Sequence, residues 1–259
     1  MKNYYQDAKQ SPKTNLIICL LLAIGIITLP TEYLVGLVVK NQTLSYLFNG
    51  IIKILLSIIA VYFIFAYRFN EVFTFKIKGF GFLTLIVALI IAISNFPFYD
   101  FLTGKTALQL NLSAVTFLVY CIGVASLEEL FFRGLIFPLS VMICQNKKRP
   151  LLLGVITSSA IFGLTHLVNI FGGNIGGTLL QVGYSFLIGA LCAITLIKTK
   201  NIFFPVIVHA VYNFCGQIPS ICGNGVAWSI GQIILTATVG VVATIYFVVV
   251  IFKVNYEKK

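Results

Sequence analysis

The chain has 259 residues, of which 59% are hydrophobic and 10% are charged, and its mean hydropathy is +1.01. Soluble domains carry about 25% charged residues, so this composition excludes an ordinary soluble protein. The net charge of +11 does not indicate a nucleic-acid partner, because the basic residues punctuate apolar runs instead of gathering on one face. This distribution is typical of a protein embedded in a lipid bilayer.

Apolar runs near the length of about 20 residues that a helix needs to cross a bilayer recur along the chain. They predict an all-α polytopic membrane helix bundle that forms a single integral membrane domain over residues 1–259. In chain order, the eight predicted spans are 16–39, 44–67, 80–99, 111–144, 151–170, 177–197, 202–218 and 226–252.

Two of these spans are irregular. Pro30 interrupts the first, and since no small-residue cleavage motif follows it we expect a retained span and not a signal peptide. The fourth would measure about 50 Å as one straight helix, which exceeds the hydrocarbon core. We expect it to bend or end near Gly134 or Pro138.

The distribution of basic residues predicts the orientation. With eight spans, Lys and Arg number 14 in the loops and tails of one side and two on the other. Because cytoplasmic loops are enriched in these residues, we expect both termini in the cytoplasm. The compact loops and Lys-rich face further suggest a multi-pass protein of the bacterial cell membrane.

Some polar residues within the spans have ordinary structural interpretations. Glu32 lies beside the break at Pro30, and Lys53 can extend to the external interface if its span begins near Gly50. The six cysteines show no CxxC spacing and are interpreted as small packing residues. A pair between Cys215 and Cys222, which flank a predicted external loop, is left open.

Glu128, Glu129 and Arg133 do not fit such interpretations, because ionisable side chains within a span are costly and mark functional sites. Glu129 and Arg133 are four residues apart, which predicts a charge-assisted pair on one helix face. Glu128 lies about 100° around the helix and has no local cation. Either it is free for chemistry, or both acids share Arg133 as structural support.

The chain's only two histidines also lie in predicted spans. Phe162 precedes His166 by four residues, and Asn213 follows His209 by four, so each histidine shares a helix face with one of these residues. Asn213 can orient His209 or act beside it as a donor to an oxyanion. We expect these polar residues to converge on one site: Glu128, Glu129, Arg133, His166, His209 and Asn213.

The depths of these residues constrain the site. His166 lies 16 residues after Pro150, about 24 Å along a straight helix, whereas His209 and Glu128 lie nearer the cytoplasmic ends of their spans. The depths agree if the fourth segment projects beyond the bilayer on the cytoplasmic side and the fifth begins outside it. We therefore expect a site in the cytoplasmic half of the membrane, where a carboxylate and an imidazole activate one water.

The three motifs EExxxR, FxxxH and HxxxN, in this order on separate spans, resemble those of the CAAX protease and bacteriocin-processing (CPBP, or Abi) intramembrane proteases. The resemblance covers about 111–218 and rests on Glu128, Glu129, Arg133, Phe162, His166, His209 and Asn213. It implies peptide-bond hydrolysis of a peptide or protein substrate that is either soluble or membrane-anchored.

By this resemblance, Glu128 and His166 activate water, and His209 and Asn213 stabilise the oxyanion. Glu129 and Arg133 support the site, together with Phe162 of the second motif. Members are also described as metalloproteases, and Glu128, His166 and His209 could ligate zinc. The sequence itself requires no cofactor, because no HExxH motif is present and a glutamate with a histidine can activate water without metal.

Two other functional classes compete with the protease. The first is a non-catalytic immunity factor, scaffold or regulator of the same fold. The second is a transporter, although no paired interrupted helices in two related halves are evident. A serine or cysteine protease is disfavoured because neither residue type occupies a motif position, although Ser126 and Cys121 lie nearby.

Overall fold

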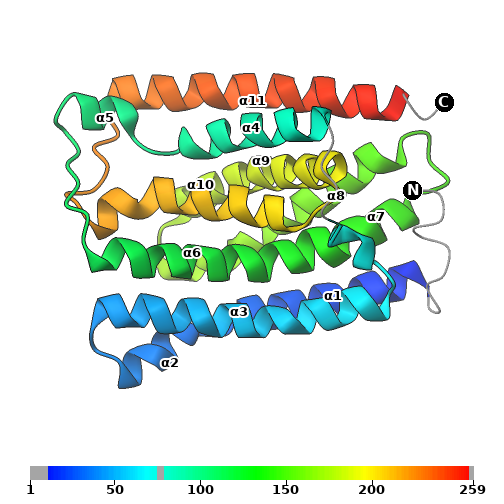
Figure 1. Cartoon of the computed structure of the whole chain (residues 1–259), viewed down its shortest axis with the longest axis horizontal. Helices are drawn as coiled ribbons and strands as arrows, with labels where there is room; N and C mark the ends of the chain where they lie inside the picture. Colours follow the sequence, from blue (N-terminus) through cyan, green and yellow to red (C-terminus); the bar gives the residue numbers. More distant parts are fainter. Residues whose placement is uncertain (1–10, 75–78, 257–259) are drawn as a thin grey trace.

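The computed structural model describes residues 11–74 and 79–256, which form a bundle of helices running mostly along its long axis (Figure 1). Among these residues, strand pairing is limited to two isolated bridges. The helices are α1 (Pro12–Ile27), α2 (Thr31–Val38), α3 (Gln42–Ala66), η2 (Asn70–Val72), α4 (Phe80–Ile93), α5 (Phe98–Leu102), α6 (Leu112–Phe131), η3 (Phe132–Ile136), α7 (Phe137–Ile143), α8 (Pro150–Thr165), η4 (His166–Gly172), α9 (Ile175–Thr199), α10 (Phe203–Ile221) and α11 (Ile230–Tyr256).

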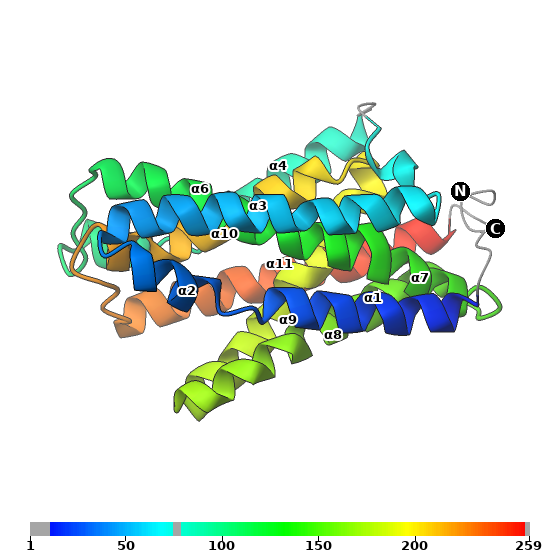
Figure 2. The same ribbon diagram turned by 90° about the horizontal axis from the view of Figure 1, so that it is seen from below.

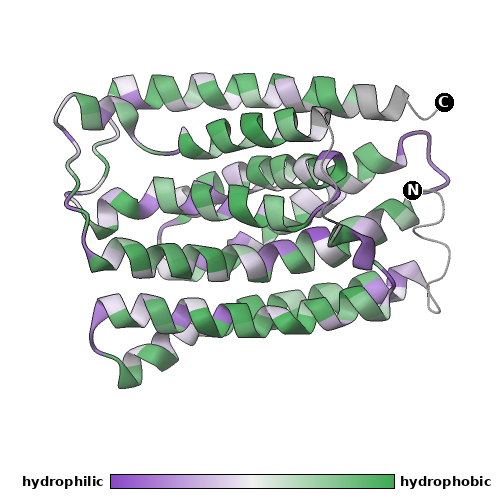
Figure 3. Cartoon of the chain, in the orientation of Figure 1, coloured by the Kyte–Doolittle hydropathy of each residue, from purple (hydrophilic) through white to green (hydrophobic). Residues whose placement is uncertain are grey.

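Six helical segments of the described residues are long and apolar enough to cross a membrane. They correspond to α1–α2, α3, α6–α7, α8–η4, α9 and most of α11, and apolar residues cover their lengths (Figure 3). The prediction of an all-α, multi-pass integral membrane protein is therefore confirmed. The other two predicted spans are also helical, as α4 and α10, but α4 has only 14 residues. The total of eight crossings stays a prediction.

The loops at each end of the bundle contact one another in the way the alternating topology requires. At one end, Ile202 donates its backbone N–H to the Val72 carbonyl at 2.7 Å, which joins two loops assigned to the cytoplasm. At the other, Gln109 donates to the Cys222 carbonyl at 2.6 Å, which joins two loops assigned to the outside. Helix α1 begins at the same end of the bundle as α11 ends (Figure 1). Which end faces the cytoplasm stays a prediction.

The long fourth segment is one continuous helical stretch whose irregularity is a π-helical turn. This turn covers Phe132–Ile136 and connects α6 to α7, with Gly134 inside it and Pro138 two residues after its end. The expected bend site is thus a widened turn in an unbroken helix. Such turns are found frequently at functional sites, and this one contains Arg133.

Helices α3 and α6 approach closely because glycines face each other. A Cβ on Gly50 would lie 2.7 Å from the Val119 carbonyl oxygen, and one on Gly123 would lie 2.4 Å from that of Gly50. Small residues allow such close contact between membrane helices, where van der Waals packing is a principal source of association. This contact holds α3 directly against the helix that carries the EExxxR motif.

Helix α8 and the start of α9 run obliquely to the other helices, and the η4 turn between them projects from the bundle (Figure 2). Asn174 caps α9 by accepting the Gly177 N–H at 2.9 Å, which satisfies one otherwise unpaired donor. Apolar residues on the projecting part are exposed, including Phe171 and Leu180. The oblique path lowers the depth that α8 gains per residue.

Candidate active site

A cavity of about 450 Å³ lies among α6, α8, η4, α9 and α10 and extends to the break between α1 and α2. Four of the expected catalytic residues line it: Glu128 from α6, His166 at the end of α8, and His209 and Asn213 from α10. Three separate parts of the chain therefore bring their polar side chains to one space. The two supporting residues Glu129 and Arg133 lie behind this wall, fully buried.

Glu129 and Arg133 form the pair that their spacing predicts, with 3.1 Å between the carboxylate Oε2 and the guanidinium Nε. Both side chains are at most 1% exposed. The contact is an ion pair without a well-aligned hydrogen bond between Nε–H and Oε2. A buried pair of this kind is costly to break, because removing one partner leaves the other as an uncompensated charge.

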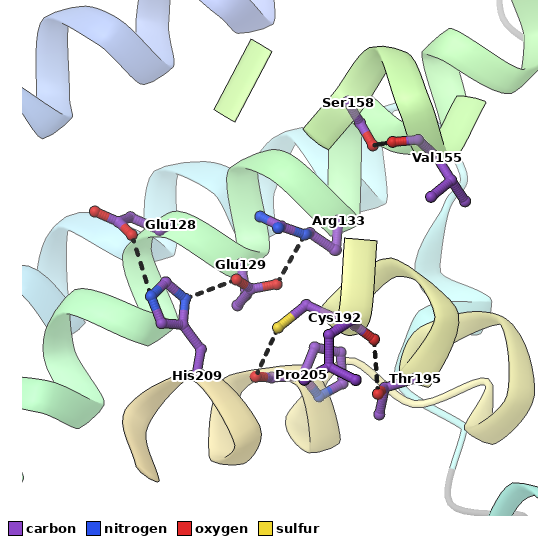
Figure 4. A network of polar contacts seen from close by, with 10 residues as sticks. Glu128, Glu129, Arg133, Val155, Ser158, Cys192, Thr195, Pro205 and His209 are labelled. Atoms are coloured by element: carbon purple, nitrogen blue, oxygen red, sulfur yellow. Dashed lines mark hydrogen bonds and ion pairs between the residues drawn. The ribbon is translucent and has the colours of Figure 1, made fainter. Parts of the chain in front are cut away.

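His209 lies between both carboxylates of the EExxxR motif (Figure 4). Its Nδ1 is 2.7 Å from Glu129 Oε1, and its Nε2 is 3.6 Å from Glu128 Oε2. A carboxylate oxygen in hydrogen-bond contact with Nδ1 fixes the orientation of the ring. The contact between Glu129 and His209 joins positions 80 residues apart, and no local pattern in the sequence indicates it.

The Arg133 guanidinium is held by aromatic faces as well as by Glu129. It lies 4.5 Å from the ring centroid of Phe162 and 5.8 Å from that of Phe132, within the range of cation–π attraction. Gly189 on α9 leaves the space that the guanidinium occupies, because a Cβ there would lie 2.8 Å from Nη2. Sequence reasoning missed Gly189, since its role depends on a packing contact between distant helices.

His166 ends α8 with its ring turned back on the helix. Its Nδ1 lies 2.9 Å from the Phe162 carbonyl oxygen. Because a carbonyl can only accept, Nδ1 is the donor in this contact, which leaves Nε2 as the nitrogen that presents a lone pair whenever the ring is neutral. The Phe162 ring meets the rings of His166 and His209 edge-on, at 5.0 and 5.7 Å between centroids. The Phe162 ring therefore contacts both histidine rings and helps to set the separation between them.

The zinc alternative, with Glu128, His166 and His209 as ligands, stays a prediction. Within residues 11–74 and 79–256, no group of three or more His, Cys, Asp or Glu side chains is placed to hold a metal ion. Glu128, His166 and His209 share the cavity without forming a ligand set.

All six cysteines are free thiols, Cys215 and Cys222 included.

Two charged residues that sequence analysis treated separately also belong to this cavity. Lys53 Nζ lies 3.1 Å from Glu32 Oε1, and the Tyr120 hydroxyl donates to the same oxygen at 2.9 Å. Lys53 is 7% exposed. The expectation that it extends to the external interface is therefore wrong, because α3 begins at Gln42 and not near Gly50, and the break after α1 brings Glu32 alongside Lys53 as a counter-ion.

The fold and this polar cavity define a multi-pass membrane protein with an internal site. Residues 110–215 match the family model described as type II CAAX prenyl endopeptidase, Rce1-like. The segment that carries the three motifs is therefore similar to the CAAX protease family, a family of intramembrane proteases, and the resemblance drawn from these motifs is confirmed. No curated protein and no solved structure is significantly similar to the chain.

Proposed function

We propose that this protein is an intramembrane endopeptidase that hydrolyses a peptide bond with a water activated by Glu128 and His166. The observation that carries the proposal is the shared cavity of Glu128, His166, His209 and Asn213 within the segment that matches the protease family. The substrate is a peptide or protein that can enter a membrane-embedded cavity, either soluble or membrane-anchored.

Exposure distinguishes the two adjacent carboxylates. The Glu128 side chain is 12% exposed and lines the cavity, whereas Glu129 is 0% exposed and contacts Arg133 and His209. A general base must reach the proton that it removes, directly or through one water. Glu128 is therefore the base, and Glu129 holds Arg133 and His209 in place.

The reaction follows from these positions. Glu128 removes a proton from water while the water oxygen attacks the carbonyl carbon, and the carbonyl electron pair moves to its oxygen. His166 Nε2 accepts a hydrogen bond from the same water and orients it. When the tetrahedral intermediate collapses, the C–N bond breaks and Glu128 returns the proton to the leaving nitrogen.

His209 and Asn213 act on the developing oxyanion. Two carboxylates and one guanidinium leave one negative charge in the cluster, which a protonated His209 neutralises. In that form Nδ1 donates to Glu129, while Nε2 faces Glu128 at 3.6 Å. Once Glu128 takes up the proton of water, Nε2–H is released toward the oxyanion beside the Asn213 amide. Donors fixed in advance at such a position supply a large share of catalysis.

The site lies in the cytoplasmic half of the bilayer in this proposal. Supporting it, α10 begins at Phe203, directly after the loop assigned to the cytoplasm, and reaches His209 six residues later. The mechanism needs no metal, consistent with side chains that form no ligand set in the described part of the chain.

The test compares the peptides of membranes from cells that carry the wild-type protein, Glu128→Ala, or the control Ser126→Ala. Ser126 lies on the same helix but does not line the cavity. We expect peptides that depend on Glu128 and not on Ser126, with all three proteins inserted at equal levels. If no peptide differs while Glu128→Ala keeps the biological effect of the wild type, a scaffold or immunity role replaces the protease.

A further inference from the structure

A pair of neutral amide side chains lines the cavity and is not used by the proposed mechanism. Asn169 of η4 donates a hydrogen bond from Nδ2 to Oε1 of Gln181 on α9, at 2.8 Å, across the hairpin that projects from the bundle (Figure 2). Both residues line the cavity that holds the catalytic groups. They belong to Pro150–Gly172 and Ile175–Thr199, two segments apolar enough to cross a membrane. Polar side chains within such segments are costly and mark functional sites.

The position of Asn169 relative to His166 follows from the type of helix. The η4 segment is a 3-10 helix that covers His166–Gly172. Such a helix has three residues per turn and rises about 2.0 Å per residue, so residues three apart share a face. Asn169 therefore lies on the same face as His166, about 6 Å further along. An extended peptide covers about 3.3–3.6 Å per residue, so this step equals about two substrate residues.

The neighbours of Gln181 show that this face of α9 borders the cavity. Tyr184 and Ser185 follow one turn later on the same face, and both line the cavity. The same relation recurs on α10, where Gln217 follows Asn213 by four residues and both line the cavity. Neutral amides therefore lie one turn beyond a catalytic residue on two walls of the site.

The hydrogen bond between the two amides leaves one acceptor and one donor for a ligand. Asn169 Oδ1 and Gln181 Nε2 have no other hydrogen-bond partner in the part of the chain that the structure describes. Exchanging N and O in both amides leaves the same set, one carbonyl oxygen and one NH2 group. This set is complementary to the main-chain N–H and C=O of one residue in an extended peptide, which point to the same side of the chain.

A substrate in this cavity needs such partners. A peptide bond within a helix has its N–H and C=O hydrogen-bonded inside the helix, and an extended segment gives up these bonds. Unpaired peptide groups are costly in an apolar environment. Because the peptide group is neutral, a neutral amide pair can replace the lost bonds without adding a buried charge.

We propose that Asn169 and Gln181 bind the main chain of an extended substrate segment, at one residue about two positions from the cleaved bond. Asn169 Oδ1 accepts the N–H of that residue, and Gln181 Nε2 donates to its C=O. The contact selects an extended conformation whatever the side chain, and it disfavours proline, which has no N–H. This inference rests on the proposed function, because it assigns a substrate contact within the same cavity.

The test uses full-length protein in detergent and a pool of synthetic apolar peptides. Mass spectrometry locates a bond whose cleavage depends on Glu128, and that peptide is resynthesised with each amide in turn replaced by an ester. The ester keeps the carbonyl and removes the N–H. Kinetics are measured for the wild type, Asn169→Leu, Gln181→Met and the control Gln145→Met. Gln145 is an exposed amide residue between α7 and α8, outside the cavity lining.

For the wild type and Gln145→Met, we expect an ester at one position about two residues from the cleaved bond to raise KM about fivefold, the scale of one neutral hydrogen bond. The kcat should change little. Asn169→Leu should show the same KM for the amide and ester forms, and Gln181→Met should raise KM for both. A purely structural tie between η4 and α9 would affect all peptides alike and leave the ratio between amide and ester forms unchanged.

Three results would overturn the inference and leave the protease proposal intact, provided that cleavage depends on Glu128. The first is the absence of any such ester-sensitive position. The second is an ester effect that persists in Asn169→Leu, and the third is an unchanged KM in Gln181→Met.

A binding measurement separates the two proposals if no peptide is cleaved. Immobilised Glu128→Gln is offered the peptides with all amides intact and the forms with single esters. It should retain the intact peptide about fivefold more than one of the ester forms. The double variant Glu128→Gln with Asn169→Leu should retain both equally. Equal retention of all forms by the single variant, or no retention at all, refutes the amide site.

Discussion

Substitution of Gly189 by alanine probes the site without touching a motif residue. The new Cβ would lie 2.8 Å from Arg133 Nη2, 3.2 Å from Phe162 Cδ1 and 3.3 Å from Ser159 Cβ. The end of an arginine can usually move away from such a contact. Here the side chain is fully buried, with Nε 3.1 Å from Glu129 Oε2 and the guanidinium 4.5 Å from the Phe162 ring centroid. Any movement of the guanidinium therefore disturbs these two contacts.

The expected cost in stability is about 1–3 kcal/mol, the range for one extra methyl group in a packed core. The expected loss of activity is larger. Phe162 spaces both histidines, and Glu129 orients His209, so a shift of either moves the groups that act on the substrate. A displacement near 1 Å can lower the rate about 100-fold.

The assay compares Gly189→Ala with Gly183→Ala on the same helix, where a Cβ meets nothing within 4 Å. Thermal unfolding in detergent and the rate of cleavage that depends on Glu128 are measured for both. Gly183→Ala should match the wild type in both measurements. Equal cleavage rates in the two variants would refute the coupling of Gly189 to the catalytic groups through Arg133 and Phe162.

Four further outcomes are expected. Glu129→Gln should lower the free energy of unfolding by about 3–5 kcal/mol, because its arginine partner is left buried without a counter-ion. Glu128→Gln should change the free energy of unfolding by less than about 1 kcal/mol yet abolish cleavage. If thermal unfolding shows the larger loss in Glu128→Gln, Glu128 is the structural carboxylate and Glu129 the base. Asn213→Ala should reduce kcat about 10²–10³-fold with KM nearly unchanged, and a purely raised KM would contradict an oxyanion role. Gly123→Ala should destabilise the bundle, because its Cβ meets the Gly50 backbone at 2.4 Å; unchanged unfolding would contradict the close contact. A chelator should leave the cleavage rate of purified protein unchanged, and loss of activity restored by added zinc would disprove the metal-free mechanism.

Much of the architecture and the membership of the site could be predicted because each depends on local patterns. Apolar run lengths identify the helices, and the i, i+4 spacing of Glu129 and Arg133 predicts their ion pair. The family match covers the motif residues. In a chain with seven acids and two histidines, few residues can take part in acid–base chemistry, so the choice is narrow.

The contacts that could not be predicted depend on how distant helices pack. Lys53 and Glu32 each have a plausible separate interpretation, and only the path of the chain after Pro30 joins them at 3.1 Å. The position of His209 between two carboxylates depends on the packing of α10 against α6. Helix α8 runs obliquely to the other helices (Figure 2), whereas sequence reasoning assumed upright helices.

The π-helical turn at Phe132–Ile136 sets how far α7 is rotated about the helix axis relative to α6. A π turn accommodates one residue more than an α turn, so deleting one residue there permits a regular α-helix. If the same residues instead formed a regular α-helix, everything beyond the turn would be rotated by about 100° and shifted by about 1.5 Å relative to α6. The registry between the carboxylates of α6 and the packing surface of α7 therefore depends on the number of residues in this turn as well as on their identity.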